Sequence, residues 1–191
     1  RGEVIDAYAV LTRTNRNCSG GATPWGTWLS CEETDKGRVW ECDPLGVKAA
    51  QLRLALGLFK HEAAAVDTKH KQVYLTEDEP DGCLYRYTPY SFDAQGNPSL
   101  DDGMLEVAQV IEGVIGSVRW HSVPDPLAST VPTRKQIVQC SHFNGGEGIW
   151  YHDGVVYFTT KGDDRVWAYQ VREQNLSIIY NAALFTWPVL T

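Results

Sequence analysis

The fold is decided by the stretch Trp28-Leu29-Ser30-Cys31-Glu32, because two later segments repeat its pattern. Those segments are Tyr74-Leu75-Thr76-Glu77-Asp78 and Tyr157-Phe158-Thr159-Thr160-Lys161, and each reads aromatic, apolar, hydroxyl and then two mostly polar residues. Each stretch is followed by a short polar turn and a second strand-like segment, namely Arg38–Cys42, Cys83–Tyr87 and Arg165–Tyr169. From the hydroxyl residue to the second aromatic residue the spacings are 10, 9 and 8. The pattern predicts one β-hairpin used three times.

Further strands are predicted around each hairpin. A third strand follows at Gln51–Leu56, Leu105–Val110 and Leu176–Tyr180. The first of these also approaches helical spacing, but Leu52, Leu54 and Leu56 alternate and Gly57 interrupts the run. A fourth strand precedes two of the hairpins, at Glu62–Asp67 and Glu147–His152. Four-stranded antiparallel units repeating at this interval are typical of β-propeller blades.

We therefore predict an all-β fold, a β-propeller present as a partial ring of about three to four four-stranded blades. The interval from Trp40 to Tyr85 is 45 residues and that from Tyr85 to Trp167 is 82, so the longer one holds an inserted loop within 88–133 or else a degenerate blade. A twisted open sheet or a sandwich is the alternative. Residues 1–191 are interpreted as part of one propeller domain cut at both ends. The sequence begins at Arg1 with neither an initiator Met nor a signal-peptide pattern, and residues 184–191 are apolar and end without a polar tail or cap.

Composition excludes several classes of protein. The chain has 191 residues, 43% of them hydrophobic, which is enough for one sizeable core and too many for a disordered chain. The formal net charge is -7, and there is neither a basic run that would follow a phosphate backbone nor an apolar stretch long enough for a membrane helix, so neither nucleic acid nor a membrane span is expected. The five cysteines are an odd number without paired zinc-type spacing, which argues against a complete disulfide framework and a zinc knuckle.

Two glutamates stand at matching points of the repeat. Glu62 and Glu147 each begin the strand that would be innermost in a blade, where it lines the central channel. Isolated glutamates are usually solvated, but apolar and small residues flank both of these. A buried carboxylate without a cation is costly, so the two positions predict a metal site in the channel.

Acidic residues next to the hairpin strands extend this candidate site. Cys31-Glu32-Glu33 and Glu77-Asp78-Glu79 each place anionic groups after an apolar strand, and carboxylates suit calcium whereas a thiolate suits a transition metal. The outer acids Glu33, Asp35, Glu79 and Asp81 are interpreted as exposed turn residues. The third hairpin has Lys161 there, which either neutralises an anionic substrate or pairs with Asp163 or Asp164.

One long segment resembles the signature of the PhoX-type alkaline phosphatases and their secreted bacterial relatives. That segment is Asn17–Glu33, NCSGGATPWGTWLSCEE, and weaker matches continue in order at Phe59–Asp67, Val73–Asp78, Leu84–Tyr87 and Gly146–Tyr151. The resemblance implies a β-propeller phosphomonoesterase, active as a monomer on small phosphorylated substrates and located in the periplasm or outside the cell. It also implies a channel that holds a mixed iron and calcium cluster.

The resemblance also assigns residues. It places the thiolate and adjacent carboxylate of the cluster on Cys31 and Glu32, two further glutamate ligands on Glu62 and Glu147, and a calcium-binding acidic pair on Glu77 and Asp78. Glu147 and Lys161 are the predicted catalytic residues.

One position departs from this family pattern, whereas Cys18 matches it. The family's better known phosphatases carry a phosphate-clamping arginine two residues before the last glutamate, where this chain has Gly145. The metal cluster is therefore more strongly indicated than the phosphatase activity. Cys18 is interpreted as a buried small hydrophobe or a partner for another thiol.

Three functions are consistent with these observations. The first is a PhoX-type metal-dependent phosphatase, and the second is a calcium-bearing propeller hydrolase of another class, such as a lactonase or esterase. The third is a non-catalytic, calcium-stabilised propeller that binds a partner protein. No Gly-x-Ser-x-Gly, P-loop or dinucleotide-binding fingerprint occurs, which disfavours serine-hydrolase and nucleotide-binding readings.

Overall fold

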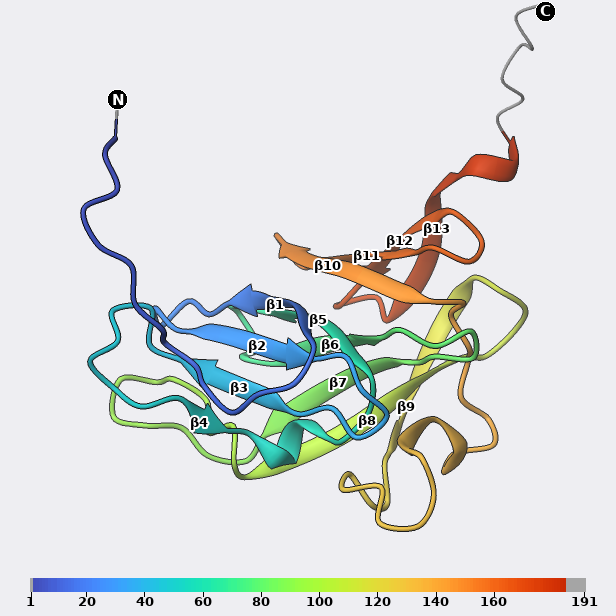
Figure 1. Cartoon of the computed structure of the whole chain (residues 1–191). Helices are drawn as coiled ribbons and strands as arrows, with labels where there is room; N and C mark the ends of the chain where they lie inside the picture. Colours follow the sequence, from blue (N-terminus) through green and yellow to red (C-terminus); the bar gives the residue numbers. More distant parts are fainter. Residues whose placement is uncertain (1, 185–191) are drawn as a thin grey trace, which may run out of the picture.

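Three four-stranded antiparallel blades make up most of the molecule (Figure 1). The computed structural model describes residues 2–184. The first blade comprises β1 (Asn17–Ala22), β2 (Trp28–Glu32), β3 (Val39–Cys42) and β4 (Gln51–Leu52). The second comprises β5 (His61–Val66), β6 (Val73–Glu77), β7 (Leu84–Pro89) and β8 (Gly103–Val110). The third comprises β10 (Gly146–His152), β11 (Val155–Thr160), β12 (Arg165–Gln170) and β13 (Asn175–Asn181). Residues 185–191, whose apolar sequence suggested a continuing chain, lie outside the described residues.

The innermost strands of the three blades lie side by side. β5 contacts both β1 and β10, while the remaining strands of each blade follow outward in chain order. This is the arrangement of a propeller, in which first strands surround a common axis. The predicted all-β fold and partial ring are therefore confirmed, with three blades in the part of the chain that the structure describes.

One innermost strand was missed by the sequence reasoning. β1 carries Gly20 and Gly21, which lack the β-branched or aromatic side chains typical of strands. A Cβ on Gly21 would lie 1.9 Å from the carbonyl oxygen of Ala64 in β5. The glycine is therefore required because β1 approaches the backbone of the neighbouring blade, and not because the segment is a turn.

An additional strand joins the second and third blades. β9 (Gly116–Ser122) pairs with β8 along its length and with the start of β13, so the two blades form one nine-stranded sheet. β9 lies inside the 88–133 window, and a long loop with the short 3₁₀ helix η2 (Thr133–Lys135) follows it. Two further 3₁₀ helices are present, η1 (Leu54–Leu56) and η3 (Ala182–Leu184). Within residues 2–184, none of the helices has the length and apolarity needed to cross a membrane.

The hydrophobic core forms between adjacent blades. One cluster, including Leu29, Phe59 and Tyr85, lies between the first and second blades, and Phe59 stacks on Tyr85 with ring centroids 4.1 Å apart. A second cluster, including Phe158 and Trp167, lies between the second and third blades. Because burial is shared across these faces, each blade is stabilised by its neighbour.

The predicted third strand of the first blade is wrong over most of its length. β4 ends at Leu52, and Leu54–Leu56 form η1. A strand would have placed Leu54 and Leu56 on the same face, whereas the 3₁₀ turn leaves Leu54 exposed and buries Leu56 completely. The local structure is therefore decided by the burial of Leu56 beneath the blade, and not by the alternation of the leucines along the sequence.

The three hairpins are confirmed, but the first is shifted by one residue relative to the sequence alignment. β2 pairs Cys31 with Val39, whereas β6 pairs Thr76 with Leu84 and β11 pairs Thr159 with Val166. Cys31 therefore corresponds to the two threonines. By the same register Glu32 corresponds to Glu77 and Thr160, and Glu33 corresponds to Asp78 and Lys161.

Candidate metal centre

Each innermost strand has a bulge at the same place. Pairing is irregular between Asn17 and Gly20 in β1, between His61 and Ala64 in β5, and between Gly146 and Ile149 in β10. The first residue inside each bulge is, in order, Cys18, Glu62 and Glu147. A bulge re-aims the side chain it carries, so three blades present one ligand-type residue each from equivalent positions.

A second equivalent set follows the second strand of each blade. The backbone N–H groups of Glu33, Asp78 and Lys161 donate to the carbonyl oxygens of Arg16, Lys60 and Gly145, at 2.9, 3.0 and 2.9 Å. Each acceptor lies two residues before a bulge residue. This bond holds the residue after the second strand beside the bulge of the same blade.

The two sets meet in one charged cluster. The ligand atoms of Cys18, Glu33 and Glu62 all lie within 4.8 Å of one another. Lys161 Nζ lies 2.7 Å from Glu147 Oε1 and 2.8 Å from Asp78 Oδ1, which joins the second and third blades. Lys60 Nζ lies 3.4 Å from Asp78 Oδ2 and 3.5 Å from Glu33 Oε1. The cluster therefore contains four carboxylates and one thiol, with two lysines that offset only part of the charge.

The electrostatics of the cluster favour a bound cation. Burial raises the pKa of Glu62, and the nearby charges of Glu147, Glu33 and Asp78 raise it further against a hydrogen bond with Cys18. The hydrogen bond to Glu62 and partial burial raise the pKa of Cys18 to about 12. Both groups thus resist ionisation while only protein charges surround them. A divalent or trivalent cation would reverse this, because it stabilises carboxylate and thiolate together.

A third equivalent set points away from the cluster, into the blades. The second aromatic residue of each hairpin donates a side-chain hydrogen bond to the last residue of the second strand: Trp40 to Glu32 at 3.0 Å, Tyr85 to Glu77 at 2.8 Å and Trp167 to Thr160 at 2.9 Å. We call Glu32, Glu77 and Thr160 the hub residues. The aromatic partner of each hub residue belongs to the same blade as the hub residue.

The two acidic hub residues are each satisfied by protein donors. Glu32 receives bonds from Arg38 Nε and Nη2 at 2.8 and 3.0 Å and from the Thr14 hydroxyl at 2.9 Å. Burial alone would raise the pKa of Glu32, but these bonds outweigh it and lower the pKa to about 2. Glu77 is completely buried and accepts from Arg134 Nη1 at 3.0 Å and from the Cys83 backbone N–H at 3.1 Å.

Two comparisons with known proteins find matches for this chain. The family model described as alkaline phosphatase PhoX matches residues 5–41 and 34–181. The chain belongs to the PhoX alkaline phosphatase family. Among solved structures, it is similar to PhoX from Pseudomonas fluorescens, determined in complex with vanadate, a transition state analogue, with a TM-score of 0.60 and 21% sequence identity. The match covers 85% of this chain and 43% of that one, so the chain spans less than half of that PhoX structure. No curated protein matches the sequence.

The structure brings together some of the residues predicted from the PhoX resemblance and separates others. Glu62, Asp78, Glu147 and Lys161 lie in the charged cluster. Glu32 and Glu77 are hub residues, engaged by arginine and aromatic donors. Cys31 is completely buried in the core between the first and second blades, where burial, then the charges of Glu62 and Cys18, raises its pKa.

Two residues of the cluster were misread in the sequence. Cys18 is exposed and adjoins Glu33 and Glu62, so its interpretation as a buried hydrophobe is wrong. Glu33 is half-buried in the cluster and is not a plain turn residue. The error at Glu33 follows from the one-residue shift of the first hairpin. The error at Cys18 has another source, because β1 was not recognised as a strand and its bulge is what makes Cys18 equivalent to Glu62 and Glu147.

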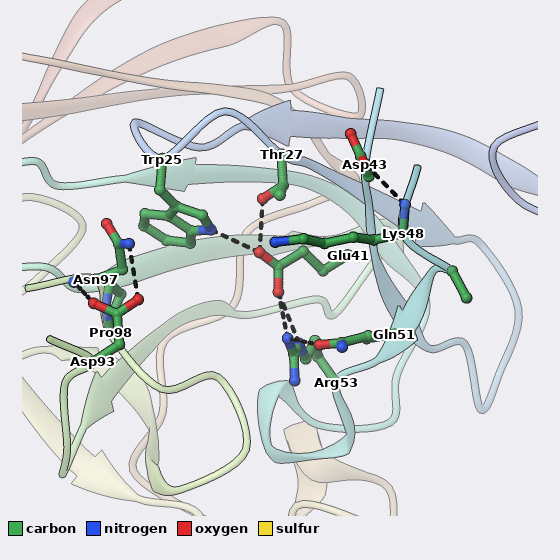
Figure 2. A pocket seen from close by; sticks show the side chains of 11 residues that line it. Trp25, Thr27, Glu41, Asp43, Lys48, Gln51, Arg53, Asp93, Asn97 and Pro98 are labelled. Atoms are coloured by element: carbon green, nitrogen blue, oxygen red, sulfur yellow. Dashed lines mark hydrogen bonds and ion pairs between the residues drawn. The ribbon is translucent and has the colours of Figure 1, made fainter. Parts of the chain in front are cut away.

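A pocket elsewhere on the first blade carries no comparable chemistry. It encloses about 280 Å³ and is lined by residues of β3, β4 and their adjoining loops, together with Asp93, Asn97 and Pro98 from the loop between β7 and β8 of the second blade (Figure 2). The carboxylate at its centre, Glu41, accepts from Trp25 Nε1 at 2.6 Å and Thr27 Oγ1 at 2.7 Å and pairs with Arg53 at 2.6 Å, as Figure 2 shows. The negative charge of Glu41 is therefore already balanced within the protein. The pocket belongs to the outer strands β3 and β4, and not to the innermost strands that carry the bulges.

Proposed function

We propose that this chain supplies part of the metal-dependent active centre of an alkaline phosphatase-type phosphomonoesterase. The observation that carries the proposal is the convergence of three equivalent bulges on one charged cluster, in a chain of the PhoX family. The vanadate complex of the Pseudomonas protein supports a phosphate-like substrate. By the same family membership we place the protein in the periplasm or outside the cell, as a monomer acting on small phosphate esters.

The donor set fits the iron and calcium that the family resemblance implies. Cys18, Glu33 and Glu62 would hold the iron, because they combine a thiolate with carboxylates inside one coordination sphere. Asp78 and Glu147 offer only oxygen atoms, which calcium prefers. Bound there, the cations would offset the negative charge of a phosphate ester and polarise its phosphorus–oxygen bonds.

The chain's own residues would orient the substrate. Lys161 is more than half exposed at its side chain and bridges Asp78 and Glu147, so its ammonium group is free to exchange one carboxylate for a phosphate oxygen. A Cβ on Gly145, which has a φ of +69°, would lie 2.8 Å from Lys161 Cγ. An arginine at 145 and the present position of Lys161 therefore exclude each other. We propose that Lys161 takes the place of the family's arginine clamp and that Glu147 positions it.

Elemental analysis of two cysteine variants tests the centre. In the intact protein, Cys18→Ser should remove iron and abolish hydrolysis of a chromogenic phosphate monoester. Cys31→Ser should retain both, because its thiol lies in the apolar core. Iron loss in Cys31→Ser alone would contradict this assignment and restore the ligand set that the resemblance implies.

The wild-type protein separates the alternative functions. Iron with calcium and phosphatase activity is the expected result. Calcium alone with lactonase or esterase activity would replace the proposed function, and calcium without any turnover would indicate a structural binding module.

A further inference from the structure

A second group of metal-type ligands lies outside the charged cluster, under the long loop that leads to β10. Cys83 and Cys140 are buried, and their sulfur atoms are 3.6 Å apart without a bond. His142 Nδ1 lies 3.8 Å from the Cys83 sulfur, and the three ligand atoms all lie within 4.8 Å of one another. Nothing in the proposed phosphatase chemistry uses these residues.

The repeat shows why Cys83 is unusual. In the first and third blades the residue two before the second aromatic is Arg38 or Arg165, whose guanidinium lies over Trp40 or Trp167 at 5.2 or 5.5 Å. The second blade has Cys83 at that position. Its hub residue instead receives the guanidinium of Arg134, which comes from the loop.

The loop is held on the second blade around this thiol. Arg134 Nε also pairs with Asp81 at 3.0 Å, and the Cys140 thiol contacts the Arg134 carbonyl oxygen at 3.4 Å. The backbone N–H of Phe143 donates to Gly82 O at 2.7 Å, directly before Cys83. The ion pairs of Arg134 and the backbone bond of Phe143 involve no thiol, so Cys140 and His142 are held beside Cys83 by more than the contacts of their own side chains.

Two of the three separations between these atoms are close to those of a tetrahedral zinc site. With Zn–S bonds of about 2.3 Å and a Zn–N bond of about 2.0 Å, tetrahedral angles place two sulfurs about 3.8 Å apart and sulfur and nitrogen about 3.5 Å apart. The sulfur–sulfur separation of 3.6 Å lies within about 0.2 Å of this geometry, and the separation of 3.8 Å between the Cys83 sulfur and His142 Nδ1 lies within about 0.3 Å. We propose that Cys83, Cys140 and His142 bind Zn²⁺, with water as the fourth ligand.

Charge and access agree with this ligand set. Binding forms two Zn–S bonds and one Zn–N bond and releases two thiol protons to solvent, so two thiolates and Zn²⁺ leave no net charge in a buried place. The adjacent pair of Glu77 and Arg134 is already balanced. His142 is exposed, so water reaches the open position.

The site would fix the loop at the point where it enters the charged cluster. Gly145 N donates to Glu79 O at 2.8 Å, and Glu147 follows two residues later. A zinc ion at Cys83 ties the loop to the second blade just before these residues. The site thus acts as a structural clamp on the segment that delivers Glu147.

Cobalt substitution tests the proposal in the intact protein. The measurements use a Cys18→Ser background, so that no thiolate of the charged cluster contributes. Apoprotein prepared with a chelator under reducing conditions is titrated with Co²⁺, and thiolate-to-cobalt charge-transfer absorption with intense visible bands is expected. Adding Cys83→Ser or Cys140→Ser should abolish this absorption, whereas Cys42→Ser, which removes another buried thiol, should leave it unchanged.

A variant of the exposed ligand separates loss of zinc binding from misfolding of the protein. His142→Ala should retain the fold and weaken Zn²⁺ binding by on the order of tenfold or more, measured against a zinc indicator. The proposal is overturned if the background protein shows no charge-transfer absorption, or if the absorption survives Cys83→Ser. A disulfide between Cys83 and Cys140, found by peptide mass in protein purified without reductant, also overturns it.

Discussion

The bulge residues and the hub residues sit in neighbouring positions of the same blades, yet their environments are opposite. Burial and surrounding carboxylates raise the pKa of Glu62 in its bulge, whereas arginine, hydroxyl and indole donors lower the pKa of the hub residue Glu32 to about 2. Glu62 has no arginine or lysine partner, whereas Glu32 is paired with Arg38. The third acid, the hub residue Glu77, is paired with Arg134, although burial raises its pKa to about 7. We infer that the partners of a carboxylate, and not its residue type, decide between a metal ligand and a structural anchor in this propeller.

The largest test of this difference is removal of the most buried hub residue. Glu77→Ala leaves Arg134 without its buried partner and the Tyr85 hydroxyl without its acceptor. Breaking a buried pair in this way should cost about 3–5 kcal/mol of unfolding free energy, measured by urea denaturation. The exposed Glu112→Ala is the control and should change stability by no more than about 0.5 kcal/mol. A Glu77 variant as stable as this control would remove the distinction between hub and bulge.

The second test removes a bulge residue and measures activity as well as stability. Glu62→Gln should lower kcat for a chromogenic phosphate ester by on the order of 10²–10³, the size of effect seen when one charge-stabilising group is lost from an active site. Because Glu62 has no cationic partner of its own among residues 2–184, the melting temperature without metal should not fall. Glu147→Gln should lower kcat to a similar degree, but it also removes the ion pair with Lys161, so its melting temperature does not discriminate. A fall in melting temperature with unchanged kcat would assign Glu62 to the scaffold.

The third test uses pH on the hub residue of the first blade. Glu32 has a pKa of about 2 in the folded protein against an ordinary value of 4.5, so the folded state binds fewer protons than the unfolded state between these values. Its contribution is therefore complete above pH 4.5 and is lost as pH falls towards 2. Glu32→Gln should cost about 1.5–3 kcal/mol at pH 7, as expected for hydrogen bonds to a charged group, and the cost should shrink in acid. A difference that stays constant with pH would contradict the assignment.

Much of the fold followed from the sequence, because hairpins repeat and repetition needs no knowledge of long-range contacts. The position of Leu56 did not follow, since burial beneath the blade overrode its alternating pattern. In the site, Glu62 and Glu147 were recognisable as equivalent residues. Cys18 was not, because the glycine-rich β1 that carries it lacks the residue types that mark a strand. Glu33 was not either, because the one-residue shift of β2 is set by pairing with β3 and has no signature in residue type. The ligand group at Cys83 was also missed, since its members are brought together by a loop of irregular structure.

The smallest expected effect belongs to the only neutral hub residue. Thr160 replaces the glutamates of the other two blades, accepts from Trp167 Nε1 and also bonds to Asp163. Thr160→Val keeps the shape and leaves the buried indole N–H without an acceptor, which should cost about 1–3 kcal/mol, towards the lower end because no charge is involved. Iron content and kcat should be unchanged, since Thr160 faces its own blade while the next residue, Lys161, reaches the cluster. If Thr160→Val lowered kcat without lowering stability, the hub would be part of the active centre and the separation of the two sets of residues would fail.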